Sequence, residues 1–135
     1  MKGGSGVYCV VVRLEREVSL RVGRLGWLRF APGTYVYTGR AARGLVARLA
    51  RHLRRRKPKR WHIDYLTAHR WARVVGLVVF LGDATRECSV NQRVMASAES
   101  DVPGFGASDC RSGCRSHLAY FGPHVASHWV KEEER

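Results

Sequence analysis

Acidic residues are scarce in this chain of 135 residues, and none lies between Glu17 and Asp64. Lys and Arg total 24 against 11 Asp and Glu, which gives a formal net charge of +13 and an isoelectric point near 10.6. The lack of local counter-charge lets the positive field extend outward over about 8–10 Å before salt screens it. This excess favours a polyanionic partner, above all nucleic acid, over a basic surface that serves only solubility.

Long apolar runs are also missing. The longest, Val74–Leu81, is far shorter than the roughly 20 residues needed to span a bilayer. The residues after Met1 show no signal-peptide cleavage pattern. We therefore expect a cytoplasmic protein with no membrane partner. Its four cysteines are then expected to be thiols or metal ligands, although intracellular disulfides occur in heat-loving organisms.

Neither an internal repeat nor a linker divides the sequence. Its 45% hydrophobic content is typical of a globular chain, so we predict one domain over residues 1–130 and a charged tail over 131–135. Period-two and continuous apolar patterns predict strands at Gly6–Leu14, in two short pieces within 19–30, at Thr34–Thr38 and at Ala72–Leu81. The first and last of these strands are apolar enough to be buried on both faces.

Helical patterns alternate with these strands. They cover Arg40 to about Arg56, a short segment at 60–66 and Glu87–Ser97, while 116–121 is either a last strand or a short helix. The chain is therefore predicted to be of the α/β class.

The helix predicted from Arg40 has an apolar face and an opposite face rich in arginine. At about 100° per residue, an apolar arc collects these side chains: Ala42, Leu45, Val46, Leu49 and Leu53. The arginines at 43, 51 and 54 point the opposite way. Arg48 and His52 lie one turn apart at the edge of the arc, so we expect both to be partly buried beside the sheet.

Ten basic residues lie between positions 40 and 60. We predict a nucleic-acid-binding segment formed by Arg40, Arg43, Arg51, Arg54, Arg55, Arg56, Lys57, Lys59, Arg60, Trp61 and His62. Trp61 is able to stack on unpaired bases, although core packing is the commoner role of an aromatic at this spacing. His62 and Asp64 form a second candidate site for phosphate or metal, and the alternative for Asp64 is to cap or pair within the basic segment.

Three motifs together resemble a known family. Gly6-Val7-Tyr8 in the first strand, Tyr37-Thr38-Gly39 at the end of a later strand, and Arg48 in a following helix are similar to the GIY-YIG nuclease superfamily. That superfamily includes intron-encoded homing endonucleases and the N-terminal nuclease domain of UvrC repair proteins. The resemblance is closer still to small GIY-YIG-like proteins that are also found fused to endonuclease III-type repair enzymes. It implies a small, mainly antiparallel sheet flanked by helices.

The resemblance also implies a function, that of a metal-dependent DNA endonuclease in DNA repair or processing. Arg48 would steady charge on the phosphorus, and Tyr8 and Tyr37 would line the site near the attacking water, with His52 one helical turn beyond Arg48. Glu87 would bind one Mg²⁺ or Mn²⁺ ion. The competing hypothesis is a nucleic-acid-binding module that keeps the fold without cleavage, and RNA fits the charge as well as DNA does.

Some residues depart from the family pattern. Val7 and Thr38 replace the isoleucines of the two named motifs, and residues 19–30 lengthen the gap between them. The asparagine that many members carry well after the glutamate is missing, since Asn91 is the only asparagine and lies one turn beyond Glu87.

The cysteines near the end of the chain offer a second metal hypothesis. Cys110, Cys114 and His117, with Cys88 as a fourth ligand, form a set that Zn²⁺ uses. Their spacing departs from the common zinc patterns, so buried thiols or a disulfide are the preferred interpretation. A loop over 104–109 that brings Ser108 and Asp109 near Glu87 is an alternative role for this region.

Overall fold

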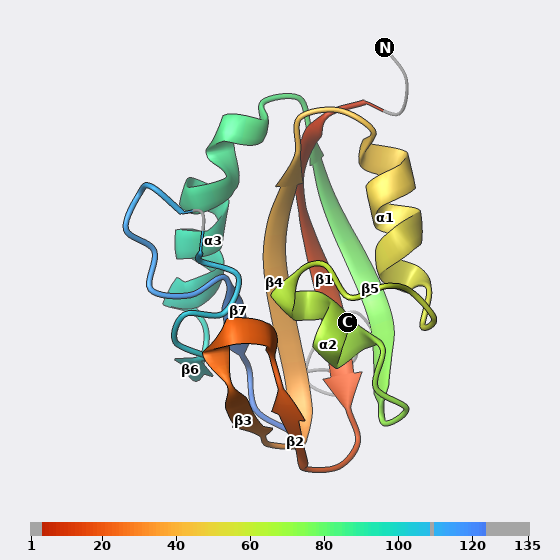
Figure 1. The fold of residues 1–135 in the computed structure, drawn as a ribbon. Coiled ribbons are helices and arrows are strands. Elements are labelled where there is room, and N and C mark those ends of the chain that lie inside the picture. The colour runs from red at the N-terminus through yellow and green to blue at the C-terminus, as the bar shows by residue number, and fades with distance from the viewer. Residues whose placement is uncertain (1–3, 109, 124–135) are drawn as a thin grey trace, which may run out of the picture.

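Five strands form the central sheet in the order β5-β1-β4-β7-β6, and each neighbouring pair is antiparallel. The computed structural model describes residues 4–108 and 110–123. The strands are β1 (Gly6–Leu14), β4 (Gly33–Ala41), β5 (Ala72–Leu81), β6 (Ser100–Asp101) and β7 (Leu118–Tyr120). This sheet, with helices on both sides, confirms the predicted α/β class (Figure 1).

The remaining elements are a hairpin and helices. β2 (Val18–Arg21) and β3 (Trp27–Phe30) pair as a separate two-stranded sheet, which confirms the hairpin predicted in this interval. The helices are α1 (Leu45–Leu53), α2 (His62–Thr67) and α3 (Glu87–Ala96), with single 3-10 turns at Gly23–Leu25 and Ala84–Arg86.

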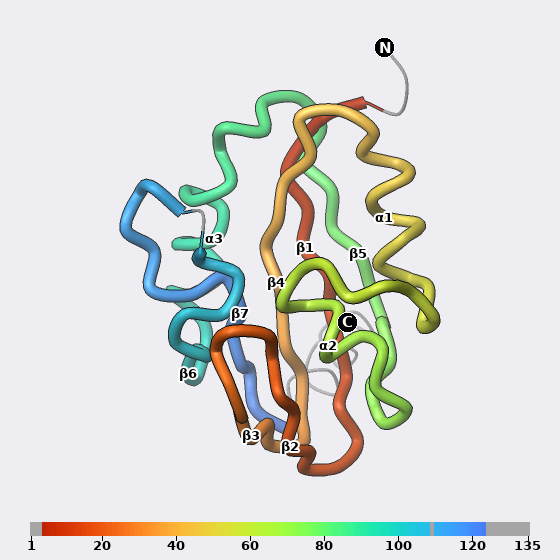
Figure 2. The backbone as a smooth tube through the Cα atoms, viewed as in Figure 1, coloured from red at the N-terminus to blue at the C-terminus, as the bar shows by residue number. Residues whose placement is uncertain are grey.

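Side chains on the two faces of β1 pack against different helices. Tyr8 and Val10 belong to a core shared with α1, α2 and the hairpin, whereas Val7 and Cys9 pack against Val90 of α3. Alternate side chains of one strand point to opposite faces, so a continuous apolar strand is what a sheet covered on both sides requires. Figures 1 and 2 show α1 and α3 on opposite sides of β1 and β4.

The start of the first helix differs from the prediction. β4 continues through Arg40 to Ala41 because these residues pair with Val7 and Gly6 of β1. The helix begins only after Gly44, which adopts the left-handed conformation with φ of 68°. Pairing with β1, which local periodicity does not reveal, therefore shortens the predicted helix.

The apolar arc predicted for this helix is also wrong at three positions, because Ala42 is exposed and precedes the helix. Val46 and Leu53 are 65% and 54% exposed, whereas Leu45 and His52 are almost fully buried. The buried stripe runs along the Leu45 and His52 side because α1 packs its histidine edge against the sheet. The expectation that Arg48 and His52 are withdrawn beside the sheet is confirmed, with Arg48 half-buried.

β5 is less buried than its composition predicts. It forms one edge of the sheet, where its outer side pairs with no other strand among the described residues. Val78 is 45% exposed and Leu81 is 76% exposed, so the expectation of burial on both faces is wrong for this strand. An apolar run indicates a strand but does not distinguish a central position from an edge.

Two further predictions concern the ends of elements and of the chain. The predicted helix at Glu87–Ser97 is confirmed as α3, and the last segment is a strand. Within the described part of the chain, no helix is long and apolar enough to cross a membrane. The predicted tail over 131–135 lies outside the described residues.

Gly39 of β4 leaves room for the ring of Tyr8, which lies on the neighbouring strand β1. It lies directly opposite Tyr8 in the pairing of β1 with β4. A Cβ at Gly39 would be 2.7 Å from the Tyr8 hydroxyl oxygen, closer than carbon tolerates. The glycine of the second motif is therefore required by the ring of Tyr8.

We expect Gly39→Ala to push the Tyr8 ring from its place and to destabilise the fold by about 1–3 kcal/mol, the usual cost of overpacking a core. Urea unfolding measures this change. Gly76→Ala is the matched control in the same sheet, because its Cβ would meet only Val11 at 3.7 Å. Equal stability of both variants would contradict the packing role of Gly39.

Candidate active site and metal cluster

A cavity of 310 Å³ collects side chains from β1, β4, α1, α2, α3 and the loop before β7. The residues that line it are Tyr8, Tyr37, Arg40, Arg48, Arg60, Trp61, His62, Glu87, Gly106, Ser108, Cys110 and His117. The structure thus brings together four of the five predicted catalytic residues, and the fifth, His52, lies directly behind Tyr8. We call this cavity the groove.

Tyr8 and His52 form a buried pair. The Tyr8 hydroxyl lies 2.8 Å from Nε2 of His52. Burial raises the pKa of Tyr8 to about 12, against the opposing effect of Arg48, and burial lowers the pKa of His52 to about 4. Both groups are therefore neutral at pH 7. A neutral imidazole beside a neutral hydroxyl shares one hydrogen bond with it, and the imidazole tautomer sets the direction of that bond.

Tyr37 lies beside this pair with its ring edge toward His52, at a centroid distance of 6.1 Å. Burial raises the pKa of its hydroxyl well above the ordinary value. Gly106 approaches the ring so closely that a Cβ there would lie 2.9 Å from Tyr37, and its φ of +70° is one that side chains disfavour. The loop before β7 therefore packs directly on the tyrosine.

Arg48 is held at the mouth of the groove without a carboxylate partner among the described residues. Its Nη1 donates to the carbonyl oxygen of Arg40 at 2.9 Å, and its guanidinium stacks over Trp61 at 4.5 Å from the ring centroid. These contacts orient the guanidinium while leaving its charge uncompensated. Such a group is suited to bind an anion.

Glu87 is the first residue of α3 and is the carboxylate of the groove. Its side chain is 20% exposed, with one oxygen 3.5 Å from Nε of Arg40 and the other 3.6 Å from Nδ1 of His117. Burial raises the pKa of Glu87, and the neighbouring side chains of His117 and Arg40 oppose that rise. Glu87 thus faces two nitrogen groups and the open groove together.

His117 is placed by the pairing of β7 with β4. Its backbone N–H donates to Phe105, and its carbonyl accepts from the N–H of Thr38 at 3.0 Å. On the ring, Nδ1 lies 3.1 Å from the carbonyl oxygen of Thr38, so the proton resides on Nδ1. Nε2 then presents a lone pair, and it is buried without a hydrogen-bond partner in the described structure.

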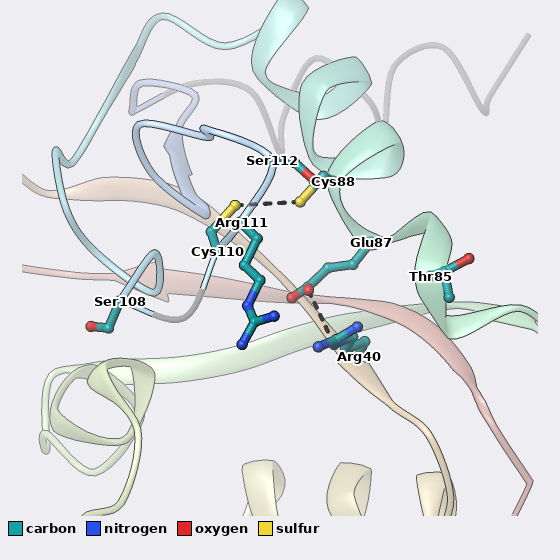
Figure 3. Close-up of a pocket in the computed structure, with 8 residues that line it drawn as sticks. All are labelled: Arg40, Thr85, Glu87, Cys88, Ser108, Cys110, Arg111 and Ser112. Carbon is teal, nitrogen blue, oxygen red and sulfur yellow. Dashed lines mark hydrogen bonds and ion pairs between the residues drawn. The ribbon is translucent and has the colours of Figure 1, made fainter.

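That lone pair belongs to a cluster of metal-binding groups. Single ligand atoms of Cys88, Cys110, Cys114 and His117 all lie within 4.8 Å of one another, an arrangement that can hold a metal ion. Sγ of Cys88 is 3.5 Å from Sγ of Cys110 (Figure 3). We call these four residues the metal cluster. Its Cys-x3-Cys-x2-His spacing departs from the common zinc patterns, and the fourth ligand, Cys88, comes from a helix 22 residues before Cys110.

The thiols of the cluster differ in acidity. Burial disfavours ionisation of Cys110, but the neighbouring His117 side chain and backbone hydrogen bonds outweigh it and lower its pKa to about 6. Burial raises the pKa of Cys88 instead. Cys9, the remaining cysteine, is buried on the α3 face of the sheet and belongs to a different part of the core.

Asp64 supplies the counter-charge that the basic segment lacks in sequence. It is fully buried and accepts two hydrogen bonds from backbone N–H groups at the start of α2, from Arg60 at 2.8 Å and Trp61 at 2.9 Å. Arg51 binds it at 3.0 Å, and Nζ of Lys57 lies at 4.0 Å. The capping and pairing role of Asp64 is the one that the structure shows.

Two predicted phosphate-binding side chains are therefore turned inward. The expectation that Arg51 points outward is wrong, because only 14% of its side chain is exposed and it faces Asp64. The Lys57 side chain is fully buried, and it donates to carbonyls at the end of α1, so it faces the interior of the protein. Arg55 is exposed but donates to the carbonyls of His69 and Ala72.

The other basic side chains of this segment stay on the surface. The exposed residues are Arg40, Arg43, Arg54, Arg56, Lys59 and Arg60. Trp61 is half-buried between the guanidiniums of Arg48 and Arg51, and it packs against the core. His62 accepts a hydrogen bond from the N–H of Gly106 at 2.8 Å, so it anchors the loop before β7.

The sequence argument missed Arg111, Thr85 and Ser112, which line a second cavity of 610 Å³ beside Glu87. No motif includes them, and only the folded loop brings them there. Ser108 lines both cavities, as expected of a loop near Glu87, whereas Asp109 lies outside the described residues. Asn91 is buried and donates to the carbonyl of Ser116 at 2.8 Å, which supports the segment before His117.

The fold and the groove define a small α/β domain with a positively charged, histidine- and tyrosine-lined cavity beside a metal cluster. Residues 7–134 match the model of a family described as domain of unknown function DUF123, and the chain belongs to that family. No curated protein and no solved structure matches the chain.

Asp64→Asn is expected to destabilise the fold by about 3–5 kcal/mol, because it leaves the buried charges of Arg51 and Lys57 unpaired. Burial favours the neutral form of Asp64, but hydrogen bonds from Arg51 and two backbone N–H groups hold its pKa below the ordinary value. Its contribution is therefore present above about pH 4 and is lost as pH falls through the folded pKa. Urea unfolding between pH 2 and pH 7 measures both effects.

Glu17→Gln is the control for this pair. Glu17 binds Arg29 at the surface, where both side chains are more than half exposed, so we expect a change of about 0–1 kcal/mol. If Asp64→Asn and Glu17→Gln had the same free energy of unfolding, the buried pair would not stabilise the fold.

Proposed function

We propose that the protein is a metal-dependent endonuclease that hydrolyses phosphodiester bonds of DNA. One observation carries the proposal. Tyr8, Tyr37, Arg48 and Glu87 come from four elements, were selected from sequence by their resemblance to GIY-YIG nucleases, and line one groove. Residues that only packed the core would have no reason to meet at one solvent-accessible cavity.

The charge pattern of the groove suits a phosphodiester. Arg48 presents an uncompensated guanidinium, which forms paired hydrogen bonds with phosphate oxygens. In this proposal it holds the scissile phosphate and stabilises the charge that develops on it. The Tyr8 hydroxyl then accepts a hydrogen bond from the attacking water and shares its other hydrogen bond with His52, so the pair positions the water, whose proton passes to solvent. The low pKa of His52 keeps its ring neutral at pH 7, so no positive charge forms behind Tyr8.

Glu87 is the residue that would hold one Mg²⁺ or Mn²⁺ ion. Its carboxylate opens into the groove, and Mg²⁺ is commonly held by one or two carboxylates together with water and substrate phosphates. A single carboxylate suits a single ion. When bound, the ion would supply a positive charge against a phosphate oxygen.

We assign Zn²⁺ to the metal cluster. Three thiols and one imidazole nitrogen form the Cys₃His set of structural zinc sites, which are closed to further ligands. Nδ1 of His117 donates to the Thr38 carbonyl, the outer hydrogen bond that zinc-binding histidines make. Zn²⁺ would also satisfy Nε2 of His117, which otherwise lacks a partner. The cluster is thus a structural site beside the reactive one.

A binding module that does not cleave is the second candidate. Both oxygens of Glu87 already face nitrogen groups, Arg40 at 3.5 Å and His117 at 3.6 Å. In this alternative the carboxylate orients His117 for the metal cluster and holds no ion of its own. The exposed arginines then bind nucleic acid without hydrolysis.

Nicking of supercoiled plasmid in Mg²⁺ or Mn²⁺ tests the nuclease proposal, with branched DNA and structured RNA as further substrates. We expect Arg48→Ala and Glu87→Gln to slow cleavage by about 100-fold or more. Arg73→Ala is the control, because Arg73 is an exposed arginine of β5 that pairs with Glu15 and does not line the groove. Equal nicking by all four proteins would refute the proposed site. Binding without cleavage of any substrate would favour the module, and cleavage of RNA alone would reassign the substrate.

Metal analysis of the purified protein tests the zinc assignment. We expect about one Zn²⁺ per chain, lost in Cys110→Ser and in Cys114→Ser, with a lower unfolding temperature in both because structural zinc contributes to folding. Cys9→Ser is the matched control and should keep the metal. A wild-type protein that is free of zinc, fully folded and disulfide-bonded through Cys88 and Cys110 would overturn the assignment.

A further inference from the structure

The groove does not end at Glu87. The 610 Å³ cavity lies next to it, and the two cavities share Arg40, Glu87, Ser108 and Cys110. Beyond Glu87 the second cavity adds one charged side chain, Arg111, and the hydroxyls of Thr85 and Ser112 (Figure 3). A chain bound at Arg48 therefore has a continuous path past Glu87 toward Arg111.

Arg111 is attached to the metal cluster by its place in the chain. It follows Cys110 directly and precedes Cys114 by three residues, so a bound metal would fix the backbone on both sides of it. In Figure 3 its side chain extends from the loop toward Glu87 and Arg40. Cys88, another ligand of the cluster, directly follows Glu87, so the same metal would also fix the backbone beside the carboxylate.

The chemistry of this extension matches a phosphate backbone. Arg40 and Arg111 stand on either side of Glu87 in the lining of the second cavity, where Glu87 is the only carboxylate among the described residues. Guanidiniums bind phosphate oxygens in pairs of hydrogen bonds, and hydroxyl groups add further donors. None of these groups reads a base edge, so the contact would be independent of sequence.

We infer that Arg111 binds a phosphate of the nucleic-acid strand beyond the cleaved position, and that the metal cluster holds it there. The inference rests on the proposed function for the position of the strand. It adds that metal at the cluster controls substrate binding, apart from any effect on cleavage. The cluster thus forms one wall of the binding site as well as a support for the fold.

Fluorescence anisotropy of a labelled DNA oligonucleotide, without added Mg²⁺ and over a range of salt concentrations, tests this inference. We expect Arg111→Ala to raise the Kd roughly tenfold and to reduce the salt slope by about one, while zinc content and unfolding temperature stay unchanged. Arg111→Lys should restore most of the slope, because a point charge still displaces a counterion.

Arg115→Ala is the matched control from the same loop. Arg115 pairs with Asp101 and lines a different cavity, so its loss should leave the Kd unchanged. Cys110→Ser should weaken binding at least as much as Arg111→Ala does, and Cys9→Ser should bind as the wild type.

The outcomes separate this inference from the nuclease proposal. If Arg111→Ala bound DNA with the wild-type Kd and salt slope, the inference would be overturned. An equal loss of DNA affinity in Arg115→Ala would overturn it as well. Either result would stand even if cleavage depends on Arg48 and Glu87. A protein that binds through Arg111 but cleaves nothing would overturn only the nuclease proposal. A wild type that binds neither DNA nor RNA would overturn both.

Discussion

The buried imidazole of His117 connects the sheet to both halves of the site. Pairing of β7 with β4 sets it beside Thr38, whose carbonyl oxygen accepts a hydrogen bond from Nδ1 at 3.1 Å. Nδ1 also faces Glu87 at 3.6 Å, while Nε2 is left for the metal cluster. One ring therefore links the sheet, the groove carboxylate and three thiols. A buried nitrogen without a partner is costly, and a metal ion removes that cost.

The basic side chains between residues 40 and 60 fall into two groups, those that face Asp64 and those that do not. The buried carboxylate of Asp64 pairs with Arg51 at 3.0 Å and lies 4.0 Å from Nζ of Lys57, so both cations face the interior. Arg48 receives no such partner among the described residues and is oriented instead by a carbonyl and by the face of Trp61. The basic segment thus contains two populations of side chain. One forms the structural network around Asp64, and the other leaves a positive surface around the groove.

The sequence predicted the presence of strands and helices better than it predicted which strands pair and which faces are buried. The uninterrupted apolar pattern of Gly6–Leu14 and the glycines around the hairpin were sufficient to identify those strands, and family resemblance selected residues that meet in the groove. The extension of β4 depends on pairing with β1, and the exposure of β5 depends on its place at the sheet edge, so neither is visible in local periodicity. The metal cluster is hard to recognise in sequence because its Cys-x3-Cys-x2-His spacing is unusual for zinc and because Cys88 comes from α3.

We propose that one groove carries a cleavage site and a structural metal side by side. Anomalous diffraction from crystals grown with Mn²⁺ and a non-cleavable oligonucleotide tests it most directly. The account predicts a zinc peak among the four ligands of the metal cluster, a manganese peak beside Glu87, and a phosphate on Arg48. A disulfide between Cys88 and Cys110, or an oligonucleotide bound elsewhere with no manganese at Glu87, would contradict it.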